Sequence, residues 1–591
     1  MTLQASFAAT LVDEWARAGV TDAVIAPGSR SSPLALGLCG DDRIRVHVRL
    51  DERSAGFFAV GLALASARPV VVVVTSGTAA VELHPAVVEA DLAGVPLVIC
   101  TADRPPEARD VGAAQTIDQQ HLYGRAARFF ADPGVPDVDG RRHWRSFASR
   151  LVAEASSGPQ GPGPVHANLP FREPLGGVPD EVPPGRPGGR PWHDVVAGDD
   201  APEAAVARLL AEFGPARRGV VVAGRGAARG DPAGVRALAT AAGWPVLADA
   251  LAFPRLPGRG VVAAWEGAVA SRAALGPLRP EVVLHVGAPP ASRALASWQA
   301  ALTGRGASHV LVDPSGRFGD PGRVAGVVLR AVPGTLCRRA ADALAGSGER
   351  PAGWLDAWDS AEAAAQLAID EVLGGSGELT EPGVARRLVA DVPAHSTLVV
   401  SSSMPIRDVD AYARPREGAP TVFANRGANG IDGVVSTVLG VAASGAAAGR
   451  SRGTGRSFGL IGDLAFFHDL SALVRGAHEG VVDATVVVVD NAGGGIFSFL
   501  PYAPDLETGL FERALAAPQS PDLAAVGTAL GCRVHQAASP AEFSAVLADA
   551  GAGRGVQLVV VRTERAANVA VHAALESAVV AAVDRALGSA G

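Results

Sequence analysis

The sequence has little cysteine, no lysine and no long apolar run. The few cysteines and the short apolar runs limit the redox compartment and the membrane topology that we expect for the chain. Its four cysteines lie far apart and form no CxxC pair, which argues against a disulfide framework and favours a reduced, cytosolic protein. The first residues contain no basic segment followed by an apolar one, so we expect no signal peptide. The valine run at 70–74 is too short to cross a membrane, and we expect no membrane insertion.

A basic surface is also lacking. The formal net charge is −8, which argues against nucleic acid as a partner. The bias towards Ala, Val, Arg and Gly is typical of a GC-rich genome rather than of a special architecture. With 591 residues, of which 48% are hydrophobic, the chain is long enough for several domains with separate cores.

Strand-like apolar runs alternate with helical patterns along the whole chain. This alternation predicts an α/β fold made of three tandem α/β domains with parallel sheets covered by helices. We place the domains at 1–185, 195–345 and 360–591. A Pro/Gly-rich stretch at 173–191 is the expected first linker, and the low-complexity stretch 443–457 is expected to be a loop.

Two predicted strand ends in the third domain carry polar side chains beside glycine. Asp463 follows the apolar run 458–461, and Asn491 follows the run 484–489. Because ligands bind at the carboxyl ends of parallel strands, we expect both side chains at one edge of the sheet. Between them, apolar positions 470, 473, 474 and 477 predict one helix that packs on the sheet.

An acid and an amide at one sheet edge suit a hard divalent cation. Mg²⁺, with Mn²⁺ as the alternative, takes few protein oxygens, and the carbonyl of Gly493 is a plausible third ligand. The competing interpretation is that Asp463 only caps a helix. Glu52, in the first domain, also lies where a strand ends and a helix begins, and its competing interpretation is an acid favoured by the helix dipole.

The spacing from Asp463 to Asn491 resembles the GD(G)…N motif of thiamin-diphosphate decarboxylases and carboligases. Leu464 stands where that family has Gly. The resemblance implies that Glu52, from a separate pyrimidine-binding domain, activates the cofactor as the catalytic acid. It implies these contacts to the cofactor: Glu52, Gly430, Ile431, Gly462, Asp463, Leu464, Asn491, Ile496 and Phe497, with Ile431 as an apolar wedge.

A narrower resemblance covers residues 24 to 501. The motifs "APGSRSSPLAL", "NRGANGIDG", "GDLAFFHDL" and "NAGGGIFSFLP" are similar to the 2-succinyl-5-enolpyruvyl-6-hydroxy-3-cyclohexene-1-carboxylate synthases of the menaquinone pathway. This resemblance implies a carboligase that uses thiamin diphosphate and Mg²⁺, takes 2-oxoglutarate and isochorismate as substrates, and works as a homodimer or a dimer of dimers.

Both implied substrates are dicarboxylates, so the site needs fixed cations, and the arginine fork matches a carboxylate. The resemblance assigns the substrate site to Ser29, Arg30, Arg104, Gln115, Arg293, Ser403, Arg407 and Arg426. All of these arginines except Arg293 fall in turns at predicted strand ends. A single solvated arginine remains the competing interpretation for each. The rival functions are another thiamin enzyme, such as an acetohydroxyacid synthase or 2-oxoacid decarboxylase, and a non-catalytic nucleotide-binding regulator.

Overall fold

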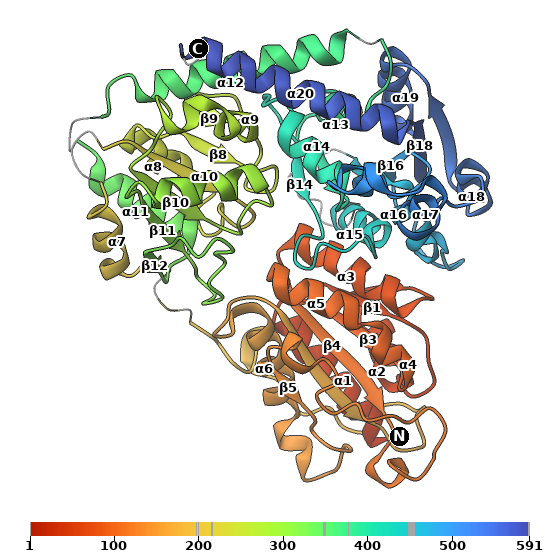
Figure 1. The fold of residues 1–591 in the computed structure, drawn as a ribbon. Coiled ribbons are helices and arrows are strands. Elements are labelled where there is room, and N and C mark those ends of the chain that lie inside the picture. The colour runs from red at the N-terminus through yellow and green to blue at the C-terminus, as the bar shows by residue number, and fades with distance from the viewer. Residues whose placement is uncertain are drawn as a thin grey trace.

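Three six-stranded parallel sheets follow one another along the chain (Figure 1), which confirms the predicted α/β architecture. The computed structural model describes residues 2–196, 198, 200–213, 217–346, 350–375, 377–446 and 456–588. The exact domain limits stay a prediction, and the three sheets with their helices are called the first, middle and third units below.

The first unit has the strand order β2-β1-β3-β4-β6-β5. Its strands are β1 (Asp22–Ile25), β2 (Arg45–Val48), β3 (Val70–Val74), β4 (Leu97–Asp103), β5 (Phe130–Ala131) and β6 (Pro164–Pro170). Its helices are α1 (Leu3–Arg17), α2 (Ser32–Cys39), α3 (Glu52–Ser66), α4 (Thr78–Glu82), α5 (His84–Ala93) and α6 (Trp144–Ser157). All five residues of β3 are buried, as expected for a central strand of a sheet covered on both faces.

The middle unit has the order β12-β11-β10-β7-β8-β9, which differs from that of the first unit. Its strands are β7 (Gly219–Ala223), β8 (Val246–Ala248), β9 (Val261–Val262), β10 (Val282–Val286), β11 (Ser308–Val312) and β12 (Val327–Leu329). Its helices are α7 (Glu203–Leu210), α8 (Gly234–Ala242), α9 (Trp265–Ala270), α10 (Arg293–Thr303), α11 (Pro333–Leu344) and α12 (Trp354–Gly374).

The third unit repeats the topology of the first, with the order β14-β13-β15-β16-β18-β17. Its strands are β13 (Thr397–Val400), β14 (Thr421–Phe423), β15 (Ser457–Gly462), β16 (Ala484–Asp490), β17 (Arg533–Ala537) and β18 (Val556–Arg562). Its helices are α13 (Glu381–Asp391), α14 (Met404–Tyr412), α15 (Val434–Ala446), α16 (Asp463–His468), α17 (Thr508–Phe511), α18 (Leu523–Ala529), α19 (Pro540–Ala552) and α20 (Arg565–Ala586).

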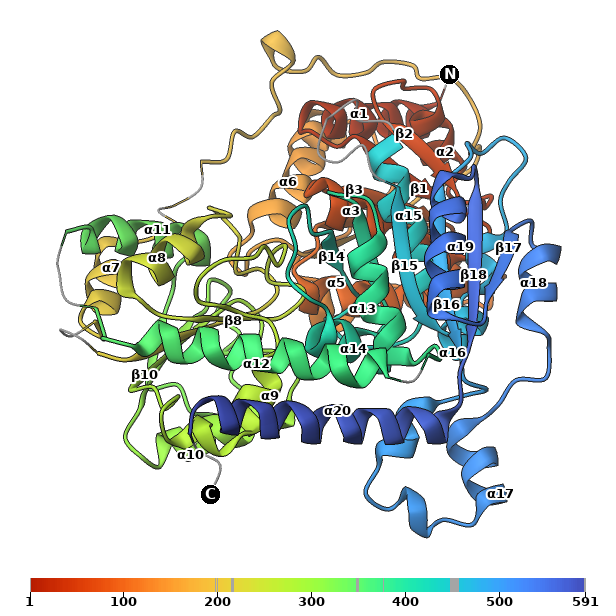
Figure 2. The same ribbon diagram turned by 90° about the horizontal axis from the view of Figure 1, so that it is seen from above.

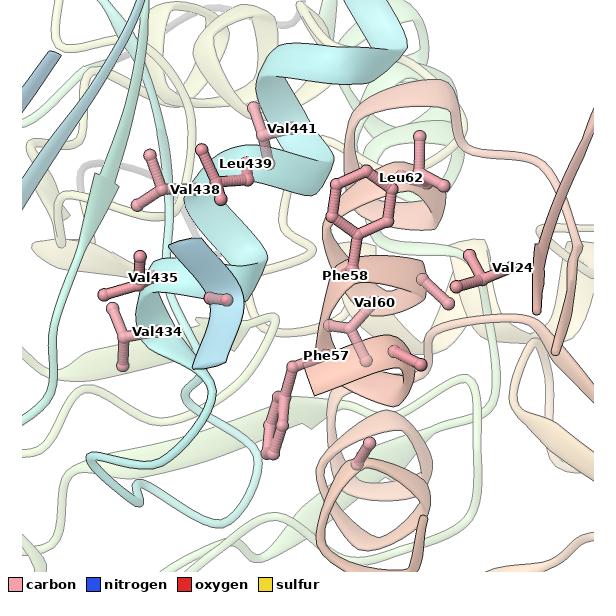
Figure 3. Close-up of a cluster of buried hydrophobic side chains, with 14 of the residues drawn as sticks. Val24, Phe57, Phe58, Val60, Leu62, Val434, Val435, Val438, Leu439 and Val441 are labelled. Carbon is pink, nitrogen blue, oxygen red and sulfur yellow. The ribbon is translucent and has the colours of Figure 1, made fainter. Parts of the chain in front are cut away.

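The first and third units pack through α3 and α15, which lie side by side and whose apolar side chains belong to one buried cluster (Figure 3). Two glycines let these helices come close. A Cβ at Gly61 would lie 2.3 Å from the carbonyl oxygen of Thr437, and a Cβ at Gly440 would lie 2.1 Å from that of Phe58. The contact therefore requires glycine on both helices, and it fixes the start of α3 against the third unit.

The last long helix, α20, returns to the middle unit and lies beside α12 (Figure 2). Leu575, Val579 and Val583 of α20 join the apolar cluster of Trp265 and Trp358. Among the described residues α20 is also the one helix with the length and apolar composition of a membrane span. That cluster buries one side of α20.

Two local predictions were wrong. The helix after Asp463 does not continue to residue 477: it ends at His468, a 3₁₀ turn follows at Leu470–Leu473, and Val474 is exposed. The helix ends here because the next residue, Asp469, is buried and accepts a hydrogen bond from the Ser436 amide of α15. The stretch 443–457 is not all loop, because α15 extends to Ala446 and β15 begins at Ser457. Residues 447–455 lie outside the described residues.

Candidate active site

Asp463 and Asn491 follow two neighbouring strands, as predicted. Strands β15 and β16 pair in parallel with Gly462 opposite Val489, so both side chains start from one edge of the third sheet. Asp463 Oδ2 accepts a hydrogen bond from the Gly493 amide at 2.6 Å, and Oδ1 accepts one from Leu464 at 2.8 Å. Burial raises the pKa of Asp463 to about 6, which reflects how poorly its charge is compensated.

Asn491 is held from one side only. Its Nδ2 donates to Glu381 Oε1 at 2.8 Å, whereas its Oδ1 is buried and has no hydrogen-bond partner among the described residues. Gly493 has φ of +131°, and a Cβ there would lie 2.3 Å from the Ala516 carbonyl oxygen. Glycine at 493 is therefore needed for the turn that brings its amide to Asp463.

These atoms fit a hard cation that takes few protein ligands. The available oxygens are the Asp463 carboxylate, the Asn491 amide oxygen and the Gly493 carbonyl. Among the residues that the structure describes, the amide oxygen has no partner and the carbonyl accepts only from Gly495. Within the described ranges, no three His, Cys, Asp or Glu side chains cluster as metal ligands. A cation here would depend on amide and backbone oxygens, with the remaining positions filled by phosphate or water.

Of the other residues predicted to contact a cofactor, four lie at this edge and two lie in the loop before α15. Gly462 and Leu464 flank Asp463, and Ile496 and Phe497 lie in the 3₁₀ turn Gly495–Phe499 that follows Asn491. Gly430 and Ile431 precede α15 in the neighbouring loop, where Ile431 is half-buried and packs against the apolar cluster of α3 and α15.

Glu52 is the first residue of α3, directly after the turn that follows β2, as predicted. Burial raises its pKa, and the nearby carboxylates Asp51 and Glu82 raise it further. The next residue, Arg53, donates to the carbonyl oxygen of His468 at 2.7 Å. In the described chain no hydrogen bond or ion pair joins Glu52 to Asp463 or the Asn491 turn.

The predicted substrate residues form two groups, and the first lies in the first unit. Arg30 is buried, donates to the Phe171 carbonyl oxygen at 2.9 Å, and has its pKa lowered by burial and by the nearby charge of Arg104. Gln115 has an exposed side chain and donates to the carbonyl oxygen of Ser76, which follows β3, at 3.0 Å. Ser29 is exposed in the turn before Arg30.

The second group lies in the third unit. Burial and the charge of Arg407 lower the pKa of Arg426, whose half-buried guanidinium donates no hydrogen bond within the described part of the chain. Arg407 donates to the Ser403 carbonyl, and it lies inside α14 rather than in a turn, which corrects the prediction. Both arginines line a cavity of about 620 Å³ to which all three units contribute.

Arg293 has the weakest connection to either group. It is the exposed first residue of α10, after the N-cap Ser292. Ser292 donates to Glu266 at 2.5 Å, and the charge of Arg407 acts on that carboxylate. No hydrogen bond or ion pair of the described residues joins the group of Arg30 to that of Arg426, so one chain holds two separate arginine groups.

Two acids at this site gave no usable signal in the sequence. Glu381 follows the N-cap Thr380 and resembles an ordinary first-turn acid, yet it is buried against Asn491. Glu89 of α5 is buried and accepts the amides of Gly427 and Ala428, both at 2.7 Å. Because both act across long sequence separations, their partners could not be identified from local patterns.

Three family models of thiamine pyrophosphate enzymes match successive stretches of the chain. Residues 5–122 match the family described as thiamine pyrophosphate enzyme, N-terminal TPP binding domain. Residues 189–400 match the middle domain of thiamine pyrophosphate enzymes, and residues 422–561 match the C-terminal TPP binding domain.

Full-length relatives share one name, 2-succinyl-5-enolpyruvyl-6-hydroxy-3-cyclohexene-1-carboxylate synthase. The protein of Thermobifida fusca (strain YX) is 44% identical over 99% of this chain and 100% of its own length. Those of Myxococcus xanthus (strain DK1622) and Geobacillus kaustophilus (strain HTA426) are 40% and 39% identical, each over 96% of both chains. The chain therefore belongs to the 2-succinyl-5-enolpyruvyl-6-hydroxy-3-cyclohexene-1-carboxylate synthase family of thiamin-diphosphate-dependent enzymes.

Proposed function

We propose that this protein is a carboligase that decarboxylates 2-oxoglutarate and adds the resulting four-carbon unit to isochorismate, giving 2-succinyl-5-enolpyruvyl-6-hydroxy-3-cyclohexene-1-carboxylate. The names of relatives that align over nearly the whole chain support the substrates. The observation that carries the proposal is the joint edge of β15 and β16, where Asp463 accepts the Gly493 amide at 2.6 Å beside an unpartnered Asn491 oxygen.

At that edge, Asp463, Asn491 and the Gly493 carbonyl would hold Mg²⁺ or Mn²⁺ against a diphosphate. The buried amide oxygen of Asn491 supports this assignment, because a buried acceptor without a partner costs free energy unless a ligand satisfies it. When bound, thiamin diphosphate supplies the nucleophilic carbon and the electron sink needed to remove CO₂ from a 2-oxoacid.

Glu52 would hold the proton that activates the cofactor. A carboxyl whose pKa is raised by burial and by neighbouring acids retains a proton closer to neutral pH, which suits proton exchange with a weakly basic ring nitrogen. Gly430, Ile431, Gly462, Leu464, Ile496 and Phe497 would surround the cofactor, with Ile431 as its apolar support.

The arginines would bind the carboxylates of the two substrates. Arg407 repels Arg426, and Arg104 repels Arg30, which nearby carboxylates such as Asp410 and Glu173 offset in part. A bound substrate carboxylate would offset the remaining repulsion in both groups. Ser29, Gln115, Ser403 and Arg293 would complete the site.

The two arginine groups and the separate Glu52 would belong to one site only if two chains contribute to it. We therefore propose a homodimer, or a dimer of dimers, as the active form. The protein would act in the cytoplasm on these small molecules, without nucleic acid or membrane insertion.

Product analysis tests this function. The purified protein, thiamin diphosphate and Mg²⁺ should convert isochorismate and 2-oxoglutarate into one new product that carries four carbons of the 2-oxoacid, with release of CO₂. Pyruvate in place of 2-oxoglutarate should give little product. Equal turnover of pyruvate would instead support an acetohydroxyacid synthase or another 2-oxoacid decarboxylase.

A further inference from the structure

A buried carboxylate lies directly behind Asn491. Glu381 is the first residue of α13, is 4% exposed, and accepts from Asn491 Nδ2 at 2.8 Å. Thr563, which follows β18, donates to the same Glu381 oxygen at 3.2 Å, and the Thr563 amide donates to the Asp490 carbonyl at 3.0 Å. Glu381 therefore connects the end of β18 to the end of β16.

A carboxamide can present either its oxygen or its NH₂ group, and only the oxygen can bind a cation. With Thr563 and Asn491 both donating to it, Glu381 Oε1 acts as an acceptor and fixes the NH₂ group of Asn491 on its own side. The opposite atom, Oδ1, is then turned away from Glu381, where it is buried without a partner. Nothing else in the described residues selects this orientation.

We infer that Glu381 is a positioning residue that sets the amide of Asn491 so that its oxygen faces the cation, an inference that rests on the proposed metal site. Glu381 would act through Asn491 and would contact neither the cation nor the substrate. Its contribution is to prevent the flipped amide, which would point NH₂ at the cation and abolish that ligand. Hydrogen-bond partners behind a metal ligand typically change metal affinity 10- to 100-fold.

A charged pair supports Glu381 from the far side. His572 of α20 has both ring nitrogens against acceptors, with Nε2 2.7 Å from Asp408 Oδ1 and Nδ1 2.8 Å from the Asn568 carbonyl. Two acceptors around one ring favour its doubly protonated form, and the hydrogen bond to Asp408 raises the pKa of His572 against the effect of burial. The positive charge of His572 offsets part of the effect of burial and of Asp408, which together raise the pKa of Glu381 to about 7.

Mn²⁺ binding, measured by electron paramagnetic resonance with thiamin diphosphate present, tests the inference without activity. Glu381→Met keeps the volume and removes both acceptors, and we expect it to weaken Mn²⁺ binding about 10- to 100-fold. Glu381→Gln can still accept through its own amide oxygen, so it should recover most of the affinity. An unchanged Mn²⁺ affinity in Glu381→Met, or equal losses in the two variants, would overturn the inference.

A second substitution separates orientation from general damage. A carboxylate at position 491 has two equivalent oxygens and needs no orientation, so Asn491→Asp should raise Mn²⁺ affinity in the Glu381→Met background. In the wild-type background the new carboxylate faces Glu381 at 2.8 Å, so the same substitution should lower affinity. The same effect in both backgrounds would contradict an orienting role, even if Glu381→Met folds poorly.

Two controls keep the inference distinct from the metal site on which it rests. Glu362 is a carboxylate that accepts the amides of Ala263 and Ala264 in the middle unit, and Glu362→Gln should leave Mn²⁺ binding unchanged. Asp463→Ala should abolish Mn²⁺ binding. If Asp463→Ala binds Mn²⁺ normally, the metal site and the proposed function fail; if only the Glu381 variants bind normally, the inference alone fails.

Discussion

Removal of Arg426 tests whether arginine charge selects the substrate. Its guanidinium is half-buried and donates no hydrogen bond within the described residues. Arg407, Asp249 and Asp410 all act on its charge from nearby, and its unused donors are available to bind a substrate carboxylate. A charge-assisted hydrogen bond contributes about 1.5–3 kcal/mol, and about 1.4 kcal/mol corresponds to a factor of ten. Arg426→Ala should therefore lower kcat/KM about 10- to 150-fold, because Arg407 remains to bind part of the charge.

Steady-state kinetics on both substrates, beside calorimetric titration of thiamin diphosphate with Mg²⁺, would measure this effect. Cofactor affinity should stay within a few-fold, because Asp463 and Asn491 are intact. Arg426→Lys should recover only part of the loss, since it lacks the planar fork. Arg414, an exposed arginine of the same unit as Arg426, pairs with Asp370 of α12 at 3.0 Å, and Arg414→Ala serves as the matched control. If Arg426→Ala retains full kcat/KM, or loses cofactor affinity in step with it, our substrate argument is refuted.

Three further predictions concern the start of α3 and its contact with the third unit. Glu52→Gln should nearly abolish CO₂ release from 2-oxoglutarate and leave calorimetric cofactor affinity within a few-fold; normal turnover would refute its role. Burial raises the pKa of Asp469 from 3.8 to about 6. The folded chain therefore binds a proton at Asp469 more tightly than the unfolded chain does. As pH rises from about 4 to about 6, the free energy of unfolding should fall by up to about 3 kcal/mol. Urea denaturation of Asp469→Asn should lack that slope, and an unchanged slope would contradict the assignment. Gly440→Val would press on the Phe58 carbonyl and should lower the free energy of unfolding by about 1–3 kcal/mol or more; Gly445→Ala, which meets nothing within 4 Å, should not.

Sequence patterns predicted the sheets and the strand ends because both follow from local chemistry. Buried parallel strands read as unbroken apolar runs, such as Val70–Val74, and a polar residue at the end of such a run marks the sheet edge, as Asp463 and Asn491 do. The helix after Asp463 was overextended for the same local reason. Helical spacing at 470–477 carries no sign that Asp469 is buried and bonded to Ser436 of α15.

What could not be predicted depends on contacts between distant segments. Glu381 meets Asn491 from 110 positions away, and Glu89 meets Gly427 across 338 positions. An acid in the first turn of a helix, or inside an amphipathic helix, has the same sequence pattern whether it faces water or a buried amide. Their roles become visible only when the third unit is folded and packed against the first.

A mixture of two inactive chains tests most directly whether Glu52 and Asp463 belong to one site formed between subunits. Glu52→Gln and Asp463→Ala chains carrying different tags would be co-expressed, and product formation from isochorismate and 2-oxoglutarate would be measured in purified mixed dimers and in each parent. Each mixed dimer would contain one site with both residues intact, so random pairing should restore about a quarter of wild-type activity to the total mixture. Mixed dimers that form but remain as inactive as the parents would contradict the account and place both residues of the site in one chain.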